Sequence, residues 1–147
     1  MDANEAVVLL VEDDADDAKL ITRALKKTTL PARVEVARSG GEAVAYICGA
    51  PPFDNRARFP LPVLVILDLK MPGVDGYEVL KMIRAGRALH DVPVVVLTAV
   101  RDAFSVSRTY ELGASVYFVK PAAGRGFAEV VREIENYWLA SQEEGEE

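Results

Sequence analysis

The sequence predicts an α/β fold in which helices cover both faces of a parallel sheet. Strand-like and helix-like segments alternate five times along the 147 residues, and such alternation favours right-handed βαβ units. Four of the expected strands are short apolar runs, which are typical of strands buried on both faces of a parallel sheet. These runs are Val7–Val11, Val63–Leu67, Val94–Leu97 and Val116–Val119.

The first strand is followed by an amphipathic helix and a second, shorter strand. The helix is expected over Asp16–Lys27, where four apolar residues recur at helical spacing. Its acidic first turn and basic last turn complement the helix dipole. The strand is expected over Arg33–Ala37.

Two capping motifs mark the starts of the second and third helices. They are Ser39-Gly-Gly-Glu42 and Asp75-Gly-Tyr-Glu78. In each, a short polar side chain caps the helix start and an acid three residues later reaches back. In the third helix, Val79, Leu80 and Ile83 form the expected buried stripe.

The last two helices follow the fourth and fifth strands. The fourth is expected over Asp102–Leu112, where Gly113 supplies a left-handed stop. The fifth is expected from about Arg125 to Ala140. Residues 1–140 would then form one domain, and residues 141–147 an acidic tail that we expect to be disordered.

The connection Gly49–Pro62 is unusual because it is long and contains four prolines. Helix-to-strand connections usually have about 2–6 residues. Two interpretations remain open, namely an extended second helix followed by a surface loop, or a feature specific to one partner.

The composition restricts the class of protein. A net charge of −6 and a pI near 4.9 argue against binding to nucleic acid. The acidic start lacks the basic and apolar regions of a secretory signal, and no apolar stretch approaches the ~18 residues of a membrane span. We therefore expect a single-domain cytoplasmic protein without membrane contact and without an output domain.

Polar side chains follow the expected strands at the edge where parallel strands bind ligands. Glu12 and Asp13 follow the first strand, and Asp68 follows the third. Converging carboxylates repel unless a cation lies between them. We expect Mg²⁺, with Asp13 and Asp68 as direct ligands, Glu12 through water and the Lys70 backbone carbonyl as a further ligand.

The remaining strand ends carry a hydroxyl and an ammonium group. Thr98 alone would be an ordinary strand residue, but Lys120 follows an apolar strand and is costly to bury without an anion. Asp68 alone could form a turn, and Asp14 is best interpreted as a helix cap. Carboxylates can also accept a phosphoryl group as nucleophiles, which gives Asp68 a candidate reaction.

These residues together resemble the receiver domain of two-component response regulators, from Val7 to about Trp138. The resemblance rests on the motif Leu67-Asp68-Leu69-Lys70-Met71-Pro72-Gly73, the acidic pair and Lys120 before Pro121. It implies a flavodoxin-like (βα)₅ fold with strand order 2-1-3-4-5 and a cis bond before Pro121. It also implies three site roles: Asp68 as phosphoacceptor, Thr98 and Lys120 as catalytic groups, and Thr98 with Tyr117 as the switch.

The implied function is signalling rather than turnover of an external substrate. A histidine kinase would phosphorylate Asp68, and the only chemistry would be Mg²⁺-dependent self-phosphorylation and self-dephosphorylation. The long Gly49–Pro62 segment resembles single-domain regulators of bacterial phytochrome kinases. One departure is Glu12, where many receivers have Asp.

We also expect a homodimer through the fourth helix, fifth strand and fifth helix. The expectation depends on Tyr137 and Trp138, which lie near the end of the fifth helix. Aromatic side chains exposed near a helix end commonly mark protein contacts. The alternative is that Trp138 packs within its own domain.

Three other functions compete with this one. A phosphatase with an Asp nucleophile would need a second Asp where Lys70 stands. A nucleotide-binding module would need a glycine-rich loop after the first strand, where this chain has acids. A receiver that has lost phosphorylation would serve only as an adaptor, although all the expected site residues are present.

Overall fold

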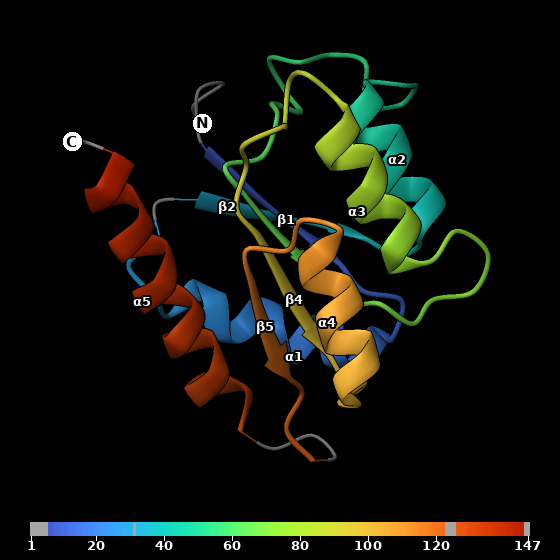
Figure 1. Ribbon diagram of the computed structural model, residues 1–147. Coiled ribbons are helices and arrows are strands. Elements are labelled where there is room, and N and C mark those ends of the chain that lie inside the picture. The colour runs from blue at the N-terminus through green and yellow to red at the C-terminus, as the bar shows by residue number, and fades with distance from the viewer. Residues whose placement is uncertain (1–5, 31, 123–125, 146–147) are drawn as a thin grey trace.

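The fold is a five-stranded parallel sheet, shown in Figure 1. The computed structural model describes residues 6–30, 32–122 and 126–145. The strands lie in the order β2-β1-β3-β4-β5, which confirms the predicted order 2-1-3-4-5. They are β1 (Ala6–Val11), β2 (Ala32–Ala37), β3 (Leu64–Leu67), β4 (Val94–Thr98) and β5 (Val116–Val119).

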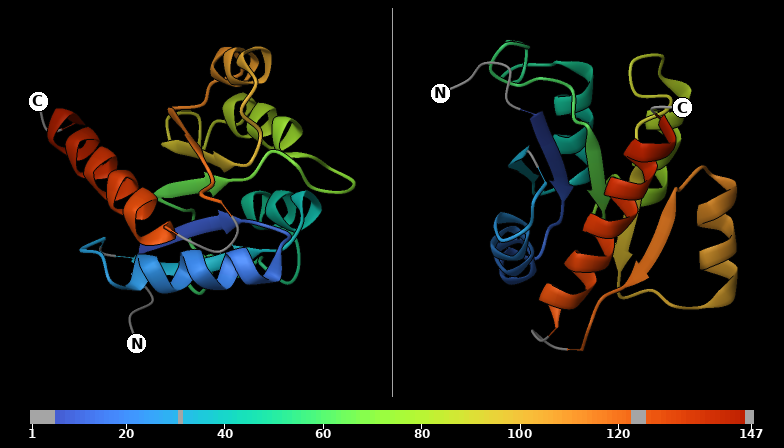
Figure 2. Two further views of the ribbon diagram at one scale, coloured as in Figure 1. Left: turned by 90° about the horizontal axis from the view of Figure 1, so that it is seen from below. Right: turned by 90° about the vertical axis from the view of Figure 1, so that its left-hand side faces the viewer.

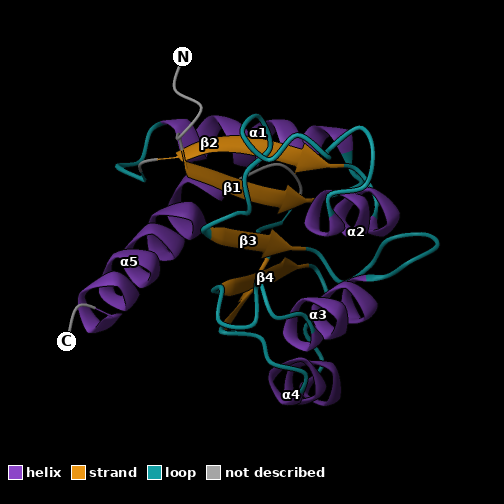
Figure 3. Ribbon diagram, turned by 90° about the horizontal axis from the view of Figure 1, so that it is seen from above, coloured by secondary structure: helices purple, strands orange, loops and turns teal. Residues whose placement is uncertain are grey.

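Five helices cover the two faces of this sheet. Figure 3 shows α2, α3 and α4 on one side and α5 on the other, and α1 packs against α5 on that second side (Figure 2). The helices are α1 (Ala15–Lys26), α2 (Gly40–Cys48), α3 (Gly76–Ala85), α4 (Ala103–Glu111) and α5 (Phe127–Gly145). None of the helices among the described residues is long and apolar enough to cross a membrane.

The core consists of two apolar layers because successive side chains of a strand point to opposite faces. In β1, Val7, Leu9 and Val11 pack toward α2 and α3. Val8 and Leu10 pack toward α1 and α5. All four residues of β3 are buried, as expected for a central strand of a parallel sheet.

Four helices begin at an aspartate or serine cap. The side chains of Asp14, Ser39, Asp75 and Asp102 each accept a hydrogen bond from a backbone N–H three residues later, at 2.9–3.0 Å. These bonds satisfy N–H groups that have no partner within the helix. Asp14 therefore has the capping role that the sequence predicts.

The structure corrects the predicted end of the last helix. Continuing past Ala140, α5 reaches Gly145, so part of the segment expected to be a disordered tail is helical. The added turn contains glutamine and glutamate, which favour helix. Arg125, the expected first residue of this helix, lies outside the described residues, and α5 begins at Phe127.

Trp138 is buried and does not form a contact surface. Its exposed fraction is 8 %, and it packs in the core layer under α1 and α5. Trp138 follows Ile134 by one helical turn, which places both on the same apolar stripe of α5. The sequence argument for a dimer through this side chain was therefore wrong.

The Gly49–Pro62 connection is an ordered surface loop rather than an extension of α2. The helix ends at Gly49, whose φ of 71° suits glycine. Arg56 donates hydrogen bonds to the carbonyls of Tyr46 (2.8 Å), Ile47 (2.6 Å) and Phe59 (3.2 Å). The loop thus caps the last carbonyls of α2.

Gly76 is required where α3 passes the end of β3. A Cβ atom at this position would lie 2.3 Å from the carbonyl oxygen of Asp68 and 2.6 Å from Cα of Leu69. Both atoms belong to the backbone, so relief would require the Asp68 loop to move. Because Gly76 has no side chain, the loop that carries Asp68 can lie close to the start of α3.

We predict that Gly76→Ala lowers the free energy of unfolding by about 2 kcal/mol or more, because overpacking against backbone is costly. Urea unfolding measures the loss. Gly41→Ala is the matched control, because a Cβ there meets nothing closer than 3.9 Å. Equal stability of the two variants would contradict the close approach.

Candidate functional site

The carboxyl ends of four strands bring the predicted site residues together. Val11 of β1 pairs with Leu67 of β3, so the residues that follow, Glu12 and Asp68, emerge side by side. Thr98 closes β4, and its carbonyl accepts a hydrogen bond of 2.8 Å from the N–H of Lys120. The register of the sheet therefore brings the site residues together.

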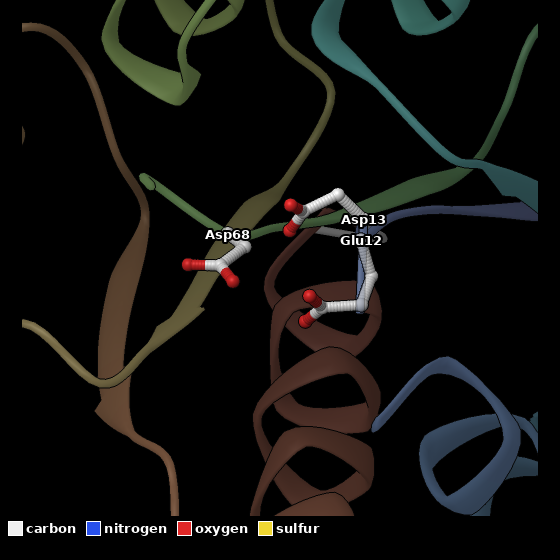
Figure 4. Close-up of side chains that lie close together, drawn as sticks. All are labelled: Glu12, Asp13 and Asp68. Carbon is white, nitrogen blue, oxygen red and sulfur yellow. The ribbon is translucent and has the colours of Figure 1, made fainter. Parts of the chain in front are cut away.

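Three carboxylates form an acidic cluster at the centre of this site. Oxygen atoms of Glu12, Asp13 and Asp68 lie within 4.8 Å of one another, and Figure 4 shows the Glu12 and Asp13 carboxylates turned toward Asp68. Glu12 and Asp68 are only 1 % and 5 % exposed. Burial raises the pKa of Glu12 to about 7; a hydrogen bond from Lys120 opposes this rise, and the charge of Asp68 adds to it.

Lys120 neutralises part of this charge. Its Nζ lies 2.7 Å from Glu12 Oε1, 2.8 Å from Asp17 Oδ2 and 2.9 Å from Asp68 Oδ2. Burial lowers the pKa of Lys120, but the hydrogen bonds to the three carboxylates outweigh burial and raise it. The lysine is therefore fully charged and joins β5 to β1, β3 and α1.

Asp17 is the site residue that the sequence analysis missed. It stands in the first turn of α1, where an acid is already explained by the helix dipole. The first turn of α1 lies at the carboxyl end of β1, where the other site residues gather. The position of Asp17, three residues after the cap Asp14, was therefore the available signal in the sequence. The structure shows that it shares Lys120 with the acidic cluster.

Thr98 and Tyr117 each donate one side-chain hydrogen bond near the ends of their strands. The Thr98 hydroxyl donates to Asp68 Oδ1 at 2.6 Å, and the Tyr117 hydroxyl donates to the Val100 carbonyl at 2.5 Å. Burial, together with the charges of neighbouring groups, raises the pKa of Tyr117 to about 12, so it remains a donor at neutral pH.

The cis peptide bond expected before Pro121 is a wrong prediction. Among the described residues, the cis bond lies between Pro51 and Pro52. Lys120 reaches the carboxylates because its backbone continues the pairing of β5 with β4. The direction of β5 is thus sufficient to place the Lys120 side chain beside the carboxylates.

The acidic cluster suits a hard divalent cation. All its candidate donors are carboxylate oxygens, which are the ligands that such cations prefer. Glu12 Oε1 is engaged by Lys120, whereas Asp13 forms no ion pair with the described residues. Lys70 donates its N–H to Asp68 Oδ1 at 3.3 Å, and the predicted role of its carbonyl as a metal ligand stays a prediction.

We predict that Lys120→Met lowers the free energy of unfolding by about 3 kcal/mol in metal-free buffer, because buried carboxylates lose their counterion. Magnesium should restore part of the loss, since a cation can replace the missing charge. Denaturant unfolding with and without MgCl₂ measures both effects. The matched control is Lys70→Met, an exposed lysine of the same pocket rim, which should change stability by less than about 0.5 kcal/mol. A fully stable Lys120→Met would show that the ion pairs are dispensable.

The chain is similar to known signalling proteins over most of its length. The probable methanogenesis regulatory protein FilR2 of Methanothrix harundinacea is 36 % identical over 133 residues, covering 90 % of this chain and 83 % of FilR2. Response regulator Rcp1 of Synechocystis is 35 % identical, covering 90 % of this chain and 88 % of Rcp1.

Solved structures agree with this similarity. The phosphorylated cyanobacterial phytochrome response regulator RcpA has a TM-score of 0.84 and 34 % identity, with 93 % of this chain and 96 % of RcpA covered. The Mn²⁺-bound form of Rcp1 has a TM-score of 0.83 and 35 % identity, with 91 % and 94 % covered. Residues 8–132 match the family described as the response regulator receiver domain. The chain therefore belongs to the response regulator receiver domain family.

Proposed function

We propose that this receiver domain accepts a phosphoryl group from a histidine kinase on Asp68 and then signals through protein contacts. The observation that carries the proposal is the set of contacts of the Asp68 carboxylate. One oxygen accepts a hydrogen bond from Thr98 and the other pairs with Lys120. Both oxygens thus lie beside groups that can bind phosphoryl oxygens.

The transfer step follows from this geometry. An Asp68 carboxylate oxygen attacks the phosphorus of the phosphohistidine, a P–O bond forms, and the P–N bond breaks with its electron pair staying on the imidazole. Lys120 then stabilises the negative charge of the phosphoryl oxygens. In self-dephosphorylation, water attacks the phosphorus, releases inorganic phosphate and restores the Asp68 carboxylate.

We assign Mg²⁺ as the cation of the acidic cluster. Asp13 and Asp68 would be its direct ligands, with Glu12 through water and the Lys70 carbonyl as a further donor. Bound there, it would offset the charge that builds up on the phosphoryl oxygens. The related Rcp1 has been solved in a Mn²⁺-bound form, which supports a divalent cation at this position.

The switch that we propose consists of Thr98 and Tyr117. Phosphorylation gives the Thr98 hydroxyl a new acceptor close to Asp68, so the end of β4 has to move only a short distance. Tyr117 is held by the Val100 carbonyl, two residues beyond Thr98. If the segment from Thr98 to Val100 shifts, the hydrogen bond between Tyr117 and the Val100 carbonyl changes. The Tyr117 side chain can then take another position, which alters the surface formed by β5 and α4.

The partner that we propose is a histidine kinase of the bacterial phytochrome type, in the cytoplasm. Support comes from RcpA, which is a cyanobacterial phytochrome response regulator and covers nearly the same length. The net charge of −6 gives no support to nucleic acid as a partner.

A homodimer through α4, β5 and α5 is the further part of the proposal. Four large apolar side chains are exposed there: Phe104 (77 %), Tyr110 (45 %), Val119 (36 %) and Leu139 (40 %). These residues replace Trp138 as the support for this face. Large exposed apolar side chains are common at protein contact surfaces.

We predict that Asp68→Asn abolishes labelling by acetyl phosphate, because the amide keeps the shape of the carboxylate but cannot form the acyl phosphate. Phosphoprotein mass after incubation with acetyl phosphate and MgCl₂ measures the result. Hydroxylamine-sensitive labelling of Asp68→Asn at the wild-type level would refute the assignment.

The same assay tests the metal ligand with two matched variants, Asp13→Asn and Asp14→Asn. Asp13→Asn removes a proposed ligand and should require far more Mg²⁺ for labelling. Asp14→Asn keeps a good helix cap and should label normally. Equal magnesium dependence of the two variants would show that Asp13 does not hold the cation.

We predict that Phe104→Glu weakens the homodimer, because a charge replaces an exposed apolar side chain at the proposed contact. Light scattering at micromolar concentration, with and without acetyl phosphate, gives the mass. Ala57→Glu adds the same charge in the exposed Gly49–Pro62 loop and should leave the mass unchanged. A monomeric wild type under both conditions would rule out the dimer.

A further inference from the structure

A groove separate from the acidic pocket runs between α1 and the edge strand β2. It is an open groove with a volume of about 570 Å³, which lies within the range of roughly 300–1,000 Å³ common for small-molecule sites. We call it the α1–β2 groove and define it by Lys19, Thr22, Arg23, Lys26, Val36 and Arg38. None of the proposed phosphorylation-site residues lines it.

The charge of the groove contrasts with that of the chain. Four cationic side chains and no carboxylate line it, although the net charge of the whole chain is −6. Lys19, Arg23 and Lys26 follow one another at i, i+4 and i+7, which places them on one face of α1. Within the described part of the chain, none of the four cations forms a salt bridge.

One lining residue, Thr22, has a buried hydroxyl. No hydrogen-bond partner for this hydroxyl exists among the described residues. Threonine in a helix usually bonds a carbonyl one turn earlier. Around this hydroxyl the lining is apolar, with alanine side chains of α1 and Val36 of β2.

These features define the chemistry of a ligand. Four exposed cations without a carboxylate among the lining residues favour a ligand with several negative charges, and the alanine and valine side chains favour an apolar body. Lys19 and Lys26 are separated by seven residues, or about 10 Å along the helix axis. A nucleoside polyphosphate has this length and combines a phosphate chain with a flat base.

We propose that the α1–β2 groove binds a small phosphorylated molecule with an apolar body, of the nucleoside polyphosphate class. Phosphates lie along Lys19, Arg23 and Lys26, with Arg38 closing the end next to the acidic pocket. The base covers the alanine and valine floor beside Thr22. Binding at this groove is independent of phosphorylation at Asp68.

One contact determines how the experiment must be designed. Arg38 Nη2 donates to the Asp13 carbonyl at 3.4 Å, so the groove ends close to the proposed metal ligands. A magnesium–nucleotide complex could therefore bind through the cation instead. The measurement must be made with EDTA and without divalent metal.

The test is calorimetric titration of the full chain with ADP, pyrophosphate and adenosine at low salt. We expect ADP to bind with one-to-one stoichiometry, pyrophosphate more weakly and adenosine not measurably. Lys19→Gln with Arg23→Gln should weaken ADP at least about tenfold, because two charge-assisted contacts are lost.

The matched control changes the same charge on the other side of the sheet. Lys81→Gln with Arg87→Gln removes two exposed cations near α3 and should bind ADP like wild type. Equal weakening in both double variants would show only general attraction and would overturn the site. No ADP binding at millimolar concentration would also overturn it.

A third outcome would reassign the groove to a protein partner. If Lys19→Gln with Arg23→Gln binds ADP like wild type but loses phosphotransfer from a histidine kinase, the cations serve the kinase and the proposal fails. Loss of ADP binding with normal acetyl phosphate labelling supports the groove. Because Asp68→Asn should bind ADP normally, failure of the phosphorylation proposal would be seen separately.

Discussion

The functional site depends on one constraint, which is that buried carboxylates converge where parallel strands end and need a cation. Glu12 and Asp68 are almost completely buried, and their charges would repel without compensation. Lys120 supplies one positive charge and is shared among Glu12, Asp17 and Asp68. It leaves an excess of negative charge, which is why the site suits a divalent cation.

The rest of the fold holds these charges in place. Register between β1 and β3 sets Glu12 beside Asp68, and the close approach of Gly76 fixes the loop that carries Asp68. Arg84 supports the opposite end of the sheet, where it donates to the carbonyls of Gly113 (2.8 Å) and Val92 (2.7 Å). At the site itself, Thr98 and Tyr117 are each held by a side-chain hydrogen bond, to Asp68 Oδ1 and to the Val100 carbonyl.

The elements of the fold could be predicted from sequence because each carries a local signal. Apolar runs gave the strands, and short polar caps gave the helix starts to within one or two residues. The convergence of Glu12, Asp13, Asp68, Thr98 and Lys120 could also be predicted, because parallel strands present their carboxyl ends at one edge. These predictions rest on periodicity and on a topological rule.

Features that depend on tertiary contacts could not be predicted in this way. Asp17 already has a local explanation as a first-turn acid, so its pairing with Lys120 is visible only in three dimensions. In the sequence, Trp138 lies near the expected end of the last helix and so was expected to be exposed. In the structure α5 continues to Gly145, and Trp138 packs in the core. The α1–β2 groove combines residues of a helix and an edge strand, and no single segment of the sequence indicates it.

The measurement that tests the central claim most directly is the position of the phosphoryl group itself. After phosphorylation by a histidine kinase in the presence of Mg²⁺, borohydride reduction converts an acyl phosphate into a stable alcohol that peptide mass spectrometry can locate. The geometry of the pocket predicts conversion of Asp68 to homoserine and of no other residue. Conversion at Glu12, Asp13 or Asp17, with Asp68 unchanged, would contradict the proposed chemistry of the pocket.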